Sequence, residues 1–186
     1  FHNDFSNLIA AGSIAGGSTP LSQGEATFTG VELSGQYDFD SGFYSTVAYT
    51  WLPIAKQDTP FVSVANNTVT GGSKAGNRQP YAPEHTLTAA LGYKMGRLNT
   101  QVEGVYVDQQ YADFAQTMAV SVDGQKGVIP SYTIWNATIN YRHEPIKTTF
   151  FVTGKNLLDN DYVVDRTRGI LTGMPRLVQF GARYDF

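Results

Sequence analysis

The 186-residue sequence contains no cysteine, which excludes disulfide frameworks, thiolate zinc sites and cysteine nucleophiles. It also has little charge, because 16% of the residues are Asp, Glu, Lys or Arg, against roughly 25% in a soluble globular domain. The formal net charge of -3 argues against a nucleic-acid partner. No apolar run approaches the ~18 residues of a membrane-spanning helix, which excludes a helical membrane protein. The alternating strands of a membrane β-barrel are not excluded by that test.

What the sequence does have is a repeated alternation of apolar and polar residues, the period-two pattern of a half-exposed β-strand. Within residues 132–142, for example, Trp135 and Ile139 share one face, while Asn136 and Thr138 share the other. We expect about eight strands and no helix. The expected strands are residues 1–10, 27–39, 43–51, 85–94, 98–108, 132–142, 148–158 and 179–186.

The connections between these strands alternate in length. The short turns are residues 38–42, 94–97 and 143–147, and the long polar segments are residues 11–24, 53–83, 109–130 and 159–174. An up-and-down meander sorts its connections in this way, whereas a Greek-key sandwich does not. The pattern therefore predicts an all-β protein, a membrane up-and-down antiparallel β-barrel.

Aromatic residues on the apolar phase gather near the strand ends. Those at the short-turn end are Tyr37, Phe39, Phe43, Tyr93, Tyr141, Tyr184 and Phe186, and those near the long segments are Tyr49, Trp51, Tyr106 and Trp135. Two such bands are typical of a lipid-facing barrel surface, because aromatic rings favour the level of the lipid headgroups. The core of a soluble sandwich would instead concentrate its large residues in mid-strand. A lipocalin-like carrier would need an apolar interior and a polar outside, the inverse of this pattern.

The opposite phase of the strands is polar. Its members are Glu32, Gln36, Asp38, Asn99, Gln101, Glu103, Asn136, Thr138, Asn140, Arg142, Gln179, Arg183 and Asp185. In a closed eight-stranded barrel these groups would have to pair in a dry network, and in a larger barrel they would face water or a folded insert. Both alternatives stay open at this point.

Five motifs, in this order along the chain, carry a family resemblance. They are Gly30–Leu33, Pro80–His85, Ile129–Tyr132, Lys155–Tyr162 and the terminal Phe186. Together they resemble the C-terminal barrel of a TonB-dependent outer-membrane receptor, and residues 123–132 resemble the ferric dicitrate receptor branch. Leu158 departs from the family, which more often has Phe at that place in its Asn-Leu-Phe-Asp motif.

The resemblance implies a 22-stranded barrel of which residues 1–186 form about the last eight strands. The plug domain, the energy-coupling box and the earlier strands would lie upstream of Phe1. Such a receptor imports an iron chelate, ferric citrate or another siderophore, across the bacterial outer membrane with energy from the TonB complex, which acts through the plug. Its other partners would be lipid, lipopolysaccharide and the barrel-assembly machinery, which would recognise Phe186 together with Tyr184. The alternative is a stand-alone eight-stranded barrel that serves as an adhesin or structural anchor.

Ferric chelates of hydroxy acids are anionic, so their recognition is expected to use guanidinium, ammonium and amide donors in the outer loops. The candidates are Lys74, Arg78, Gln79, Arg166 and Arg168. Of these, Arg166 and Arg168 share a β-phase and are expected to project to one side together. The competing interpretation is that loop charges only keep the surface solvated or contact lipopolysaccharide.

Two further features of the loops bear on function. Tyr111 and Phe114 are expected to add an aromatic wall to the mouth or to belong to an interface band. His2, His85 and His143 are scattered without metal-ligand spacing, and no catalytic triad can be assigned. We therefore expect no bound metal, no cofactor and no enzymatic activity.

Overall fold

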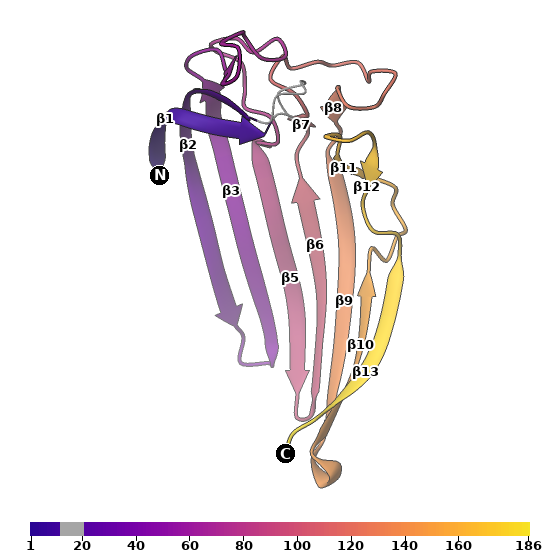
Figure 1. Cartoon of the computed structure of the whole chain (residues 1–186). Helices are drawn as coiled ribbons and strands as arrows, with labels where there is room; N and C mark the ends of the chain where they lie inside the picture. Colours follow the sequence, from indigo (N-terminus) through magenta and orange to yellow (C-terminus); the bar gives the residue numbers. More distant parts are fainter. Residues whose placement is uncertain (12–20) are drawn as a thin grey trace.

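The computed structural model describes residues 1–11 and 21–186, which form one large antiparallel sheet (Figure 1). Its strand order is β1-β2-β3-β5-β6-β9-β10-β13, and β4 pairs with β2. These strands are β1 (His2–Ala11), β2 (Leu21–Asp38), β3 (Phe43–Gln57), β4 (Val62–Ser63), β5 (His85–Met95), β6 (Leu98–Val107), β9 (Tyr132–His143), β10 (Thr148–Lys155) and β13 (Leu177–Tyr184). Two small hairpins pair β7 (Gln110–Tyr111) with β8 (Val128–Ile129) and β11 (Val163–Asp165) with β12 (Leu171–Thr172). The prediction of eight long strands in a meander is confirmed, and the sheet is open, with β1 and β13 at its edges.

All three tight turns lie at one end of the sheet and the long connections at the other (Figure 1). In the described residues the only helical segment is a single 3-10 turn, Glu144–Ile146, between β9 and β10. Its Pro145 stands where a helix start tolerates a missing N–H, and Lys147 ends it in the left-handed conformation at φ 46°. Among the described residues no helix has both the length and the apolar character needed to cross a membrane.

Strand β3 continues six residues beyond the predicted end at Trp51, because Pro53 sits where it interrupts no ladder. Proline lacks the N–H that a paired strand must donate. On one side the pairing with β5 ends at Trp51 and His85. On the other side Pro53 falls within the register shift between Thr29 and Val31 of β2. A proline inside an alternating run therefore does not end the strand here.

The same irregularity bends β2, so that β1 pairs only with its loop-end half, residues 21–29. The amide N–H of Gly30 donates to the carbonyl of Phe1 (3.1 Å), and the N-terminal amine of Phe1 donates to the carbonyl of Gly30 (2.9 Å). A Cβ on Gly30 would lie 2.6 Å from the carbonyl oxygen of Trp51, so only glycine allows this close approach. As a result β1 lies crosswise to the long strands at the loop end (Figure 1).

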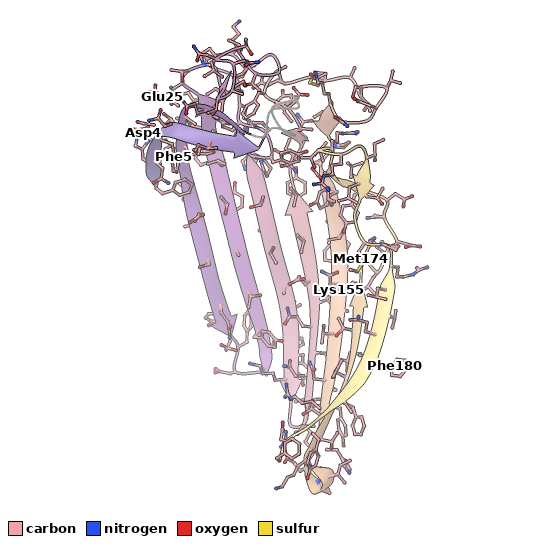
Figure 2. All side chains as sticks on the ribbon, viewed as in Figure 1. Asp4, Phe5, Glu25, Lys155, Met174 and Phe180 are labelled. Carbon is pink, nitrogen blue, oxygen red and sulfur yellow. The ribbon has the colours of Figure 1, made fainter. Side chains whose placement is uncertain are left out.

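The pairing register gives the sheet two faces of opposite character. On the apolar face, Leu33, Tyr49, Leu87 and Tyr106 align across four neighbouring strands. Large apolar side chains stay exposed along this face, among them Phe180, which stands away from the edge strand β13 in Figure 2. The aromatic bands lie where the sequence places them; at the short-turn end, for example, the rings of Phe43 and Tyr93 contact at 4.6 Å. An exposed apolar face of this extent suits a lipid surface rather than water.

Candidate functional site

Three of the long connections, residues 58–84, 108–131 and 156–176, contact one another, and we call them the loop layer. Its packed centre is the stacked pair Phe61 and Phe114, whose rings lie 4.6 Å apart and are both buried. Leu8 and Ala10 of β1 pack against them. A Cβ on Gly24 would lie 2.7 Å from the Phe61 ring, so the glycine makes room for that ring. The first two connections and the β1–β2 hairpin therefore form one packed unit.

Gln57, at the end of β3, is fully buried and joins the first two connections. Its Nε2 donates to the carbonyls of Phe114 (3.0 Å) and Arg78 (3.3 Å). Its Oε1 accepts a hydrogen bond from the Ser73 hydroxyl, whose oxygen accepts the amide N–H of Phe61 (2.8 Å). Because a buried amide without partners is costly, this network fixes the shape of the layer.

Tyr81 ties the third connection to the other two. Its amide N–H donates to the carbonyl of Tyr111 (2.9 Å), and its hydroxyl oxygen accepts the amide N–H of Arg166 (3.1 Å). Burial, together with the hydrogen bond to Asp165, raises the pKa of Tyr81, so the phenol stays protonated and can donate to that carboxylate. Burial alone would raise the pKa of Asp165, but hydrogen bonds from Thr167 and Tyr81 outweigh it and lower that pKa.

The two predicted arginines of the third connection differ in their exposure to solvent. Arg166 is only 3% exposed, and its Nη1 donates to the carbonyl of Gly124 (3.3 Å). Arg168 is exposed. The expectation that they project to one side is wrong, because the β11–β12 hairpin packs the Arg166 side chain against the turn that contains Gly124. The alternation of residues in a short hairpin does not show which of its two faces is covered by another loop.

The predicted residues of the first connection also separate. The Arg78 guanidinium donates to the carbonyls of Ala82 (2.7 Å) and Leu52 (2.6 Å), so it fastens the base of the loop rather than facing solvent. Burial lowers the pKa of Arg78, although an arginine remains charged. Gln79 is buried, and Lys74 is exposed. The described structure therefore leaves Lys74 and Arg168 as the predicted donors that are open to solvent.

Phe114 does not line a mouth. It is 2% exposed and belongs to the packed centre of the loop layer, so that part of the expectation is wrong. Tyr111 is half-buried in the β7–β8 hairpin. The aromatic character of this connection serves packing within the layer.

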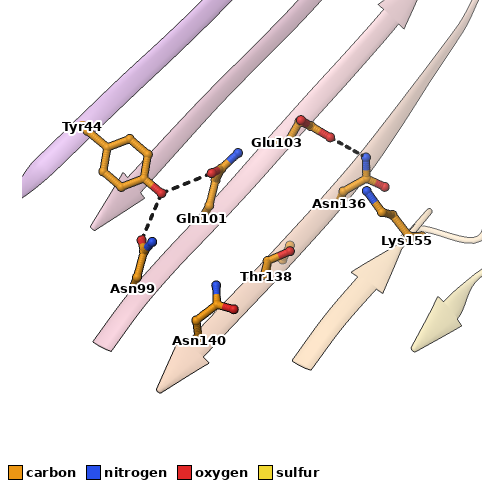
Figure 3. A pocket seen from close by; sticks show the side chains of 9 residues that line it. Tyr44, Asn99, Gln101, Glu103, Asn136, Thr138, Asn140 and Lys155 are labelled. Atoms are coloured by element: carbon orange, nitrogen blue, oxygen red, sulfur yellow. Dashed lines mark hydrogen bonds between the residues drawn. The ribbon is translucent and has the colours of Figure 1, made fainter. Parts of the chain in front are cut away.

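The polar face carries a hollow of about 270 Å³ between β6 and β9 (Figure 3). The hydroxyl of Tyr44, on β3, lies 3.0 Å from Oδ1 of Asn99 and 3.1 Å from Oε1 of Gln101. The Tyr44 ring lies flat over Gly92, where a Cβ would be 2.0 Å from it, and Lys94 Nζ lies 4.5 Å from the ring centroid. The other polar side chains that line the hollow are Glu103, Asn136, Thr138, Asn140 and Lys155.

Asn136 connects this hollow to the loop layer. Its Nδ2 donates to Oε1 of Glu103 (2.8 Å), and its Oδ1 accepts the amide N–H of Asn156 (3.1 Å). Asn156 is 1% exposed, and its own amide nitrogen donates to the carbonyls of Asn160 (2.9 Å) and Met174 (3.0 Å). The Asn-Leu-Leu-Asp motif thus starts the third connection and holds its two ends together.

The predicted assembly residues lie at the short-turn end. The rings of Tyr184 and Phe186 meet edge to face at 5.2 Å, and both are exposed. Between them Asp185 pairs with the guanidinium of Arg142 on β9 and, at 3.6 Å, with that of Arg183. Asp185 therefore ties the last residues of the chain to β9, while both aromatic rings stay exposed.

Two of the three histidines, His2 and His85, make ordinary hydrogen bonds. His2 lies 2.7 Å from the Thr29 hydroxyl and 3.1 Å from Asp4, and His85 lies 2.9 Å from the Tyr49 hydroxyl. Within the described ranges, no group of three or more His, Cys, Asp or Glu side chains is placed to hold a metal ion. What the arrangement offers is a hydrogen-bonding wall of amides and hydroxyls, with one carboxylate and one ammonium group, beneath a tightly packed loop layer.

Sequence reasoning missed Gln57, Tyr81 and the role of Asn156. Tyr81 and Asn156 adopt left-handed φ values of 55° and 46°. Asn156 lies within a motif that is visible in the sequence, and asparagine tolerates the left-handed conformation. A turn at this residue could therefore have been predicted. Tyr81 also lies within a displayed motif, Pro80–His85, but its partners come from the other two connections, and a motif does not identify them. Gln57 carried no signal, because its partners lie in two connections far along the chain.

Comparison with known proteins points to one family. Residues 1–157 match the family model described as TonB dependent receptor-like, beta-barrel. The unliganded ferric citrate transporter FecA is 25% identical with a TM-score of 0.70, and the match covers 86% of this chain and 24% of that chain.

Two further solved structures share the fold. The siderophore receptor PiuA from Acinetobacter baumannii is 21% identical with a TM-score of 0.72, covering 97% of this chain and 24% of that one. The ferric-catecholate import receptor Fiu from E. coli K12 is 19% identical with a TM-score of 0.66, covering 97% and 24%. The chain therefore spans about a quarter of the length of each protein.

Proposed function

The chain belongs to the TonB-dependent receptor β-barrel family, and from this membership we propose that it is part of an outer-membrane receptor that takes up an iron chelate. The family consists of transport receptors of the outer membrane, not enzymes. The observation that carries the proposal is the two-faced sheet, with exposed apolar and aromatic side chains on one face and amides, hydroxyls and charges on the other. Such a sheet belongs between lipid and a polar interior.

The chain length relative to its relatives supports a partial barrel. With 24% of the FecA and PiuA chains covered, we propose that residues 1–186 form the C-terminal eight strands of a 22-stranded barrel. Both sheet edges would then pair with strands outside this chain, which removes the exposed backbone groups that lipid cannot satisfy. A plug domain would occupy the interior and transmit energy from the TonB complex.

The ligand class follows from the donors that the loop layer leaves exposed. Lys74 and Arg168 suit an anionic ferric chelate of hydroxy-acid type, and the likeness to the ferric citrate transporter favours ferric citrate. Arg78, Gln79 and Arg166 would act on the ligand indirectly, by holding the loops.

The remaining partners follow from the two ends of the sheet. Lipid and lipopolysaccharide would contact the apolar face and its loop-end aromatics. The barrel-assembly machinery would bind the exposed rings of Tyr184 and Phe186. Truncation of Phe186 in the full-length protein tests this role, because it should lower the amount of folded receptor in the outer membrane.

Uptake of radiolabelled iron as ferric citrate, a ferric catecholate and a ferric hydroxamate, by cells that express the full-length receptor, tests the function. We expect saturable binding of one chelate and accumulation that a proton uncoupler abolishes while binding persists. Lys74→Ala combined with Arg168→Ala should weaken binding about tenfold to a hundredfold, since each hydrogen bond to a charged group is worth about 1.5 to 3 kcal/mol when buried and less when exposed. Lys147→Ala, at the short-turn end, is the matched control. A receptor that neither binds nor accumulates any of the chelates would refute the proposal and favour an adhesin or anchor.

A further inference from the structure

The hollow on the polar face continues toward the short-turn end. A second hollow of about 290 Å³ adjoins it, and the two share Asn99 on β6 and Asn140 on β9. Together they form one polar furrow that follows the β6–β9 seam. Its lower lining includes Lys94, Arg97 and Arg142, together with the carboxylate of Glu144, which lies 3.4 Å from the Arg142 guanidinium.

The furrow exists because its side chains are short or held flat. Asn99 and Asn140 oppose each other across the seam, as do Gln101 and Thr138. Tyr44, the large ring beside them, cannot rise from the wall, since it lies over Gly92 with its hydroxyl against two amide oxygens (Figure 3). The furrow is therefore already open in this structure, and no flexible side chain has to move aside to form it.

Charge is distributed unevenly along the furrow. Lys155 stands at the upper end and Arg97 at the lower end, both exposed, and neither makes an ion pair with any residue that the structure describes. The middle section consists of amides and hydroxyls. The one carboxylate of the upper hollow, Glu103, accepts a hydrogen bond from Asn136.

This pattern attracts an anion at both ends and holds it weakly in between. Passage through a protein requires sites that are favourable enough to enter and weak enough to leave. Neutral amides and hydroxyls offer hydrogen bonds to carboxylate and hydroxyl oxygens without the strong Coulomb attraction of a buried cation. A carboxylate placed in the middle would oppose the anion directly.

We propose that the β6–β9 furrow is the transit path along the barrel wall for an oxygen-rich anionic ferric chelate. The proposal rests on the proposed function and deepens it by assigning a path below the loop layer. Asn99, Gln101, Thr138 and Asn140 contact the chelate in passage, and Lys155 and Arg97 mark the two ends. Tyr44 is a positioning residue that keeps the path open.

The test uses the full-length receptor and the ferric chelate that the wild type takes up from the panel above. Asn140→Asp on β9 and Gln101→Glu on β6 each add one negative charge with almost no change in size. Ser34→Asp adds the same charge to the polar face of β2, outside the furrow. Binding is measured on cells treated with an uncoupler, and uptake on energised cells.

We expect both furrow variants to bind the chelate like the wild type but to take it up at least about fivefold more slowly. The reason is that repulsion between two like charges about 4 Å apart lowers the probability of that contact by about fivefold even in bulk water. Ser34→Asp should take it up at the wild-type rate. Unchanged surface binding shows that a slow variant is folded. Wild-type uptake by Asn140→Asp and Gln101→Glu overturns the path while leaving the receptor function intact. Absence of binding and uptake in the wild type overturns the receptor function itself.

Discussion

Replacing Asn156 tests the idea that one side chain closes the third connection. Its amide nitrogen donates to the carbonyls of Asn160 and Met174, and its Oδ1 accepts the amide N–H of Asn160 (3.1 Å). At a net value of about 1 kcal/mol for each hydrogen bond, the side chain stabilises the closed connection by about 3 kcal/mol. Because the φ of residue 156 is left-handed, at 46°, an alanine there costs roughly a further 1 kcal/mol of backbone strain. A glycine does not have this additional cost. Asn156→Ala should therefore cost about 4 kcal/mol and Asn156→Gly about 3 kcal/mol.

The measurement is amide hydrogen exchange over residues 156–176 of the intact receptor, because the cost falls on local opening rather than on the whole barrel. At about 1.4 kcal/mol per factor of ten, exchange should accelerate roughly a hundredfold for the glycine variant and close to a thousandfold for the alanine variant. Asn67→Ala is the matched control, since Asn67 is exposed with a similar φ of 52°. Acceleration of less than about tenfold in both Asn156 variants would refute the role of the hydrogen bonds. Equal rates for alanine and glycine would refute the backbone contribution.

Three further outcomes follow from the packing. Gly92→Ala places a Cβ 2.0 Å from the Tyr44 ring, so the amount of SDS-resistant folded protein on unheated gels should decline. Gly35→Ala, where the Cβ meets nothing within 4 Å, should fold normally. Phe61→Ala removes half of the stacked pair and should destabilise the loop layer by about 3 to 5 kcal/mol, seen as faster proteolysis of residues 58–84; resistance equal to wild type would contradict this. Asp165 has a lowered pKa in the folded state, so its contribution is complete above its unfolded value of about 3.9 and is lost as the pH falls through the folded value. Protease sensitivity of residues 159–174 should therefore rise only below about pH 4, and Asp165→Asn should show it already at neutral pH.

The strands were predictable because lipid and a polar interior impose opposite demands on alternate residues. The prediction placed the start of seven of the eight long strands within two residues, from His85 and Tyr132 for example, because those strands begin at a change from irregular to alternating sequence. The exception is β2, which begins at Leu21. The prediction of strand ends failed at the loop end of the sheet, where residues no longer lie between lipid and a polar interior. There β2 and β3 continue as strands beyond the apolar bands, and Pro53 reads as a break although it interrupts no ladder.

The loop layer was largely unpredictable for a physical reason. In a strand the position of a residue decides its surroundings, but in a connection the surroundings are set by other connections. Arg78 and Arg166 resemble free cations in the sequence, but the guanidinium group of each donates to backbone carbonyls of the loop layer or its base. Gln57 resembles an ordinary polar strand end, and it is the buried junction of two loops. Asn156 and Tyr81 both lie inside recognisable motifs, but asparagine is the residue type for which a left-handed conformation is expected.

The mutual fastening of the three connections has a consequence for receptor engineering. Transplanting any single connection into a related barrel would separate Tyr81 or Gln57 from some of its hydrogen-bond partners and leave buried polar groups unpaired. The three connections should therefore be exchanged together, with the β1–β2 hairpin beneath them. Libraries that aim at a new cargo would do better to vary the exposed tip, Met118, Val120 and Val122, and leave the fastened bases untouched.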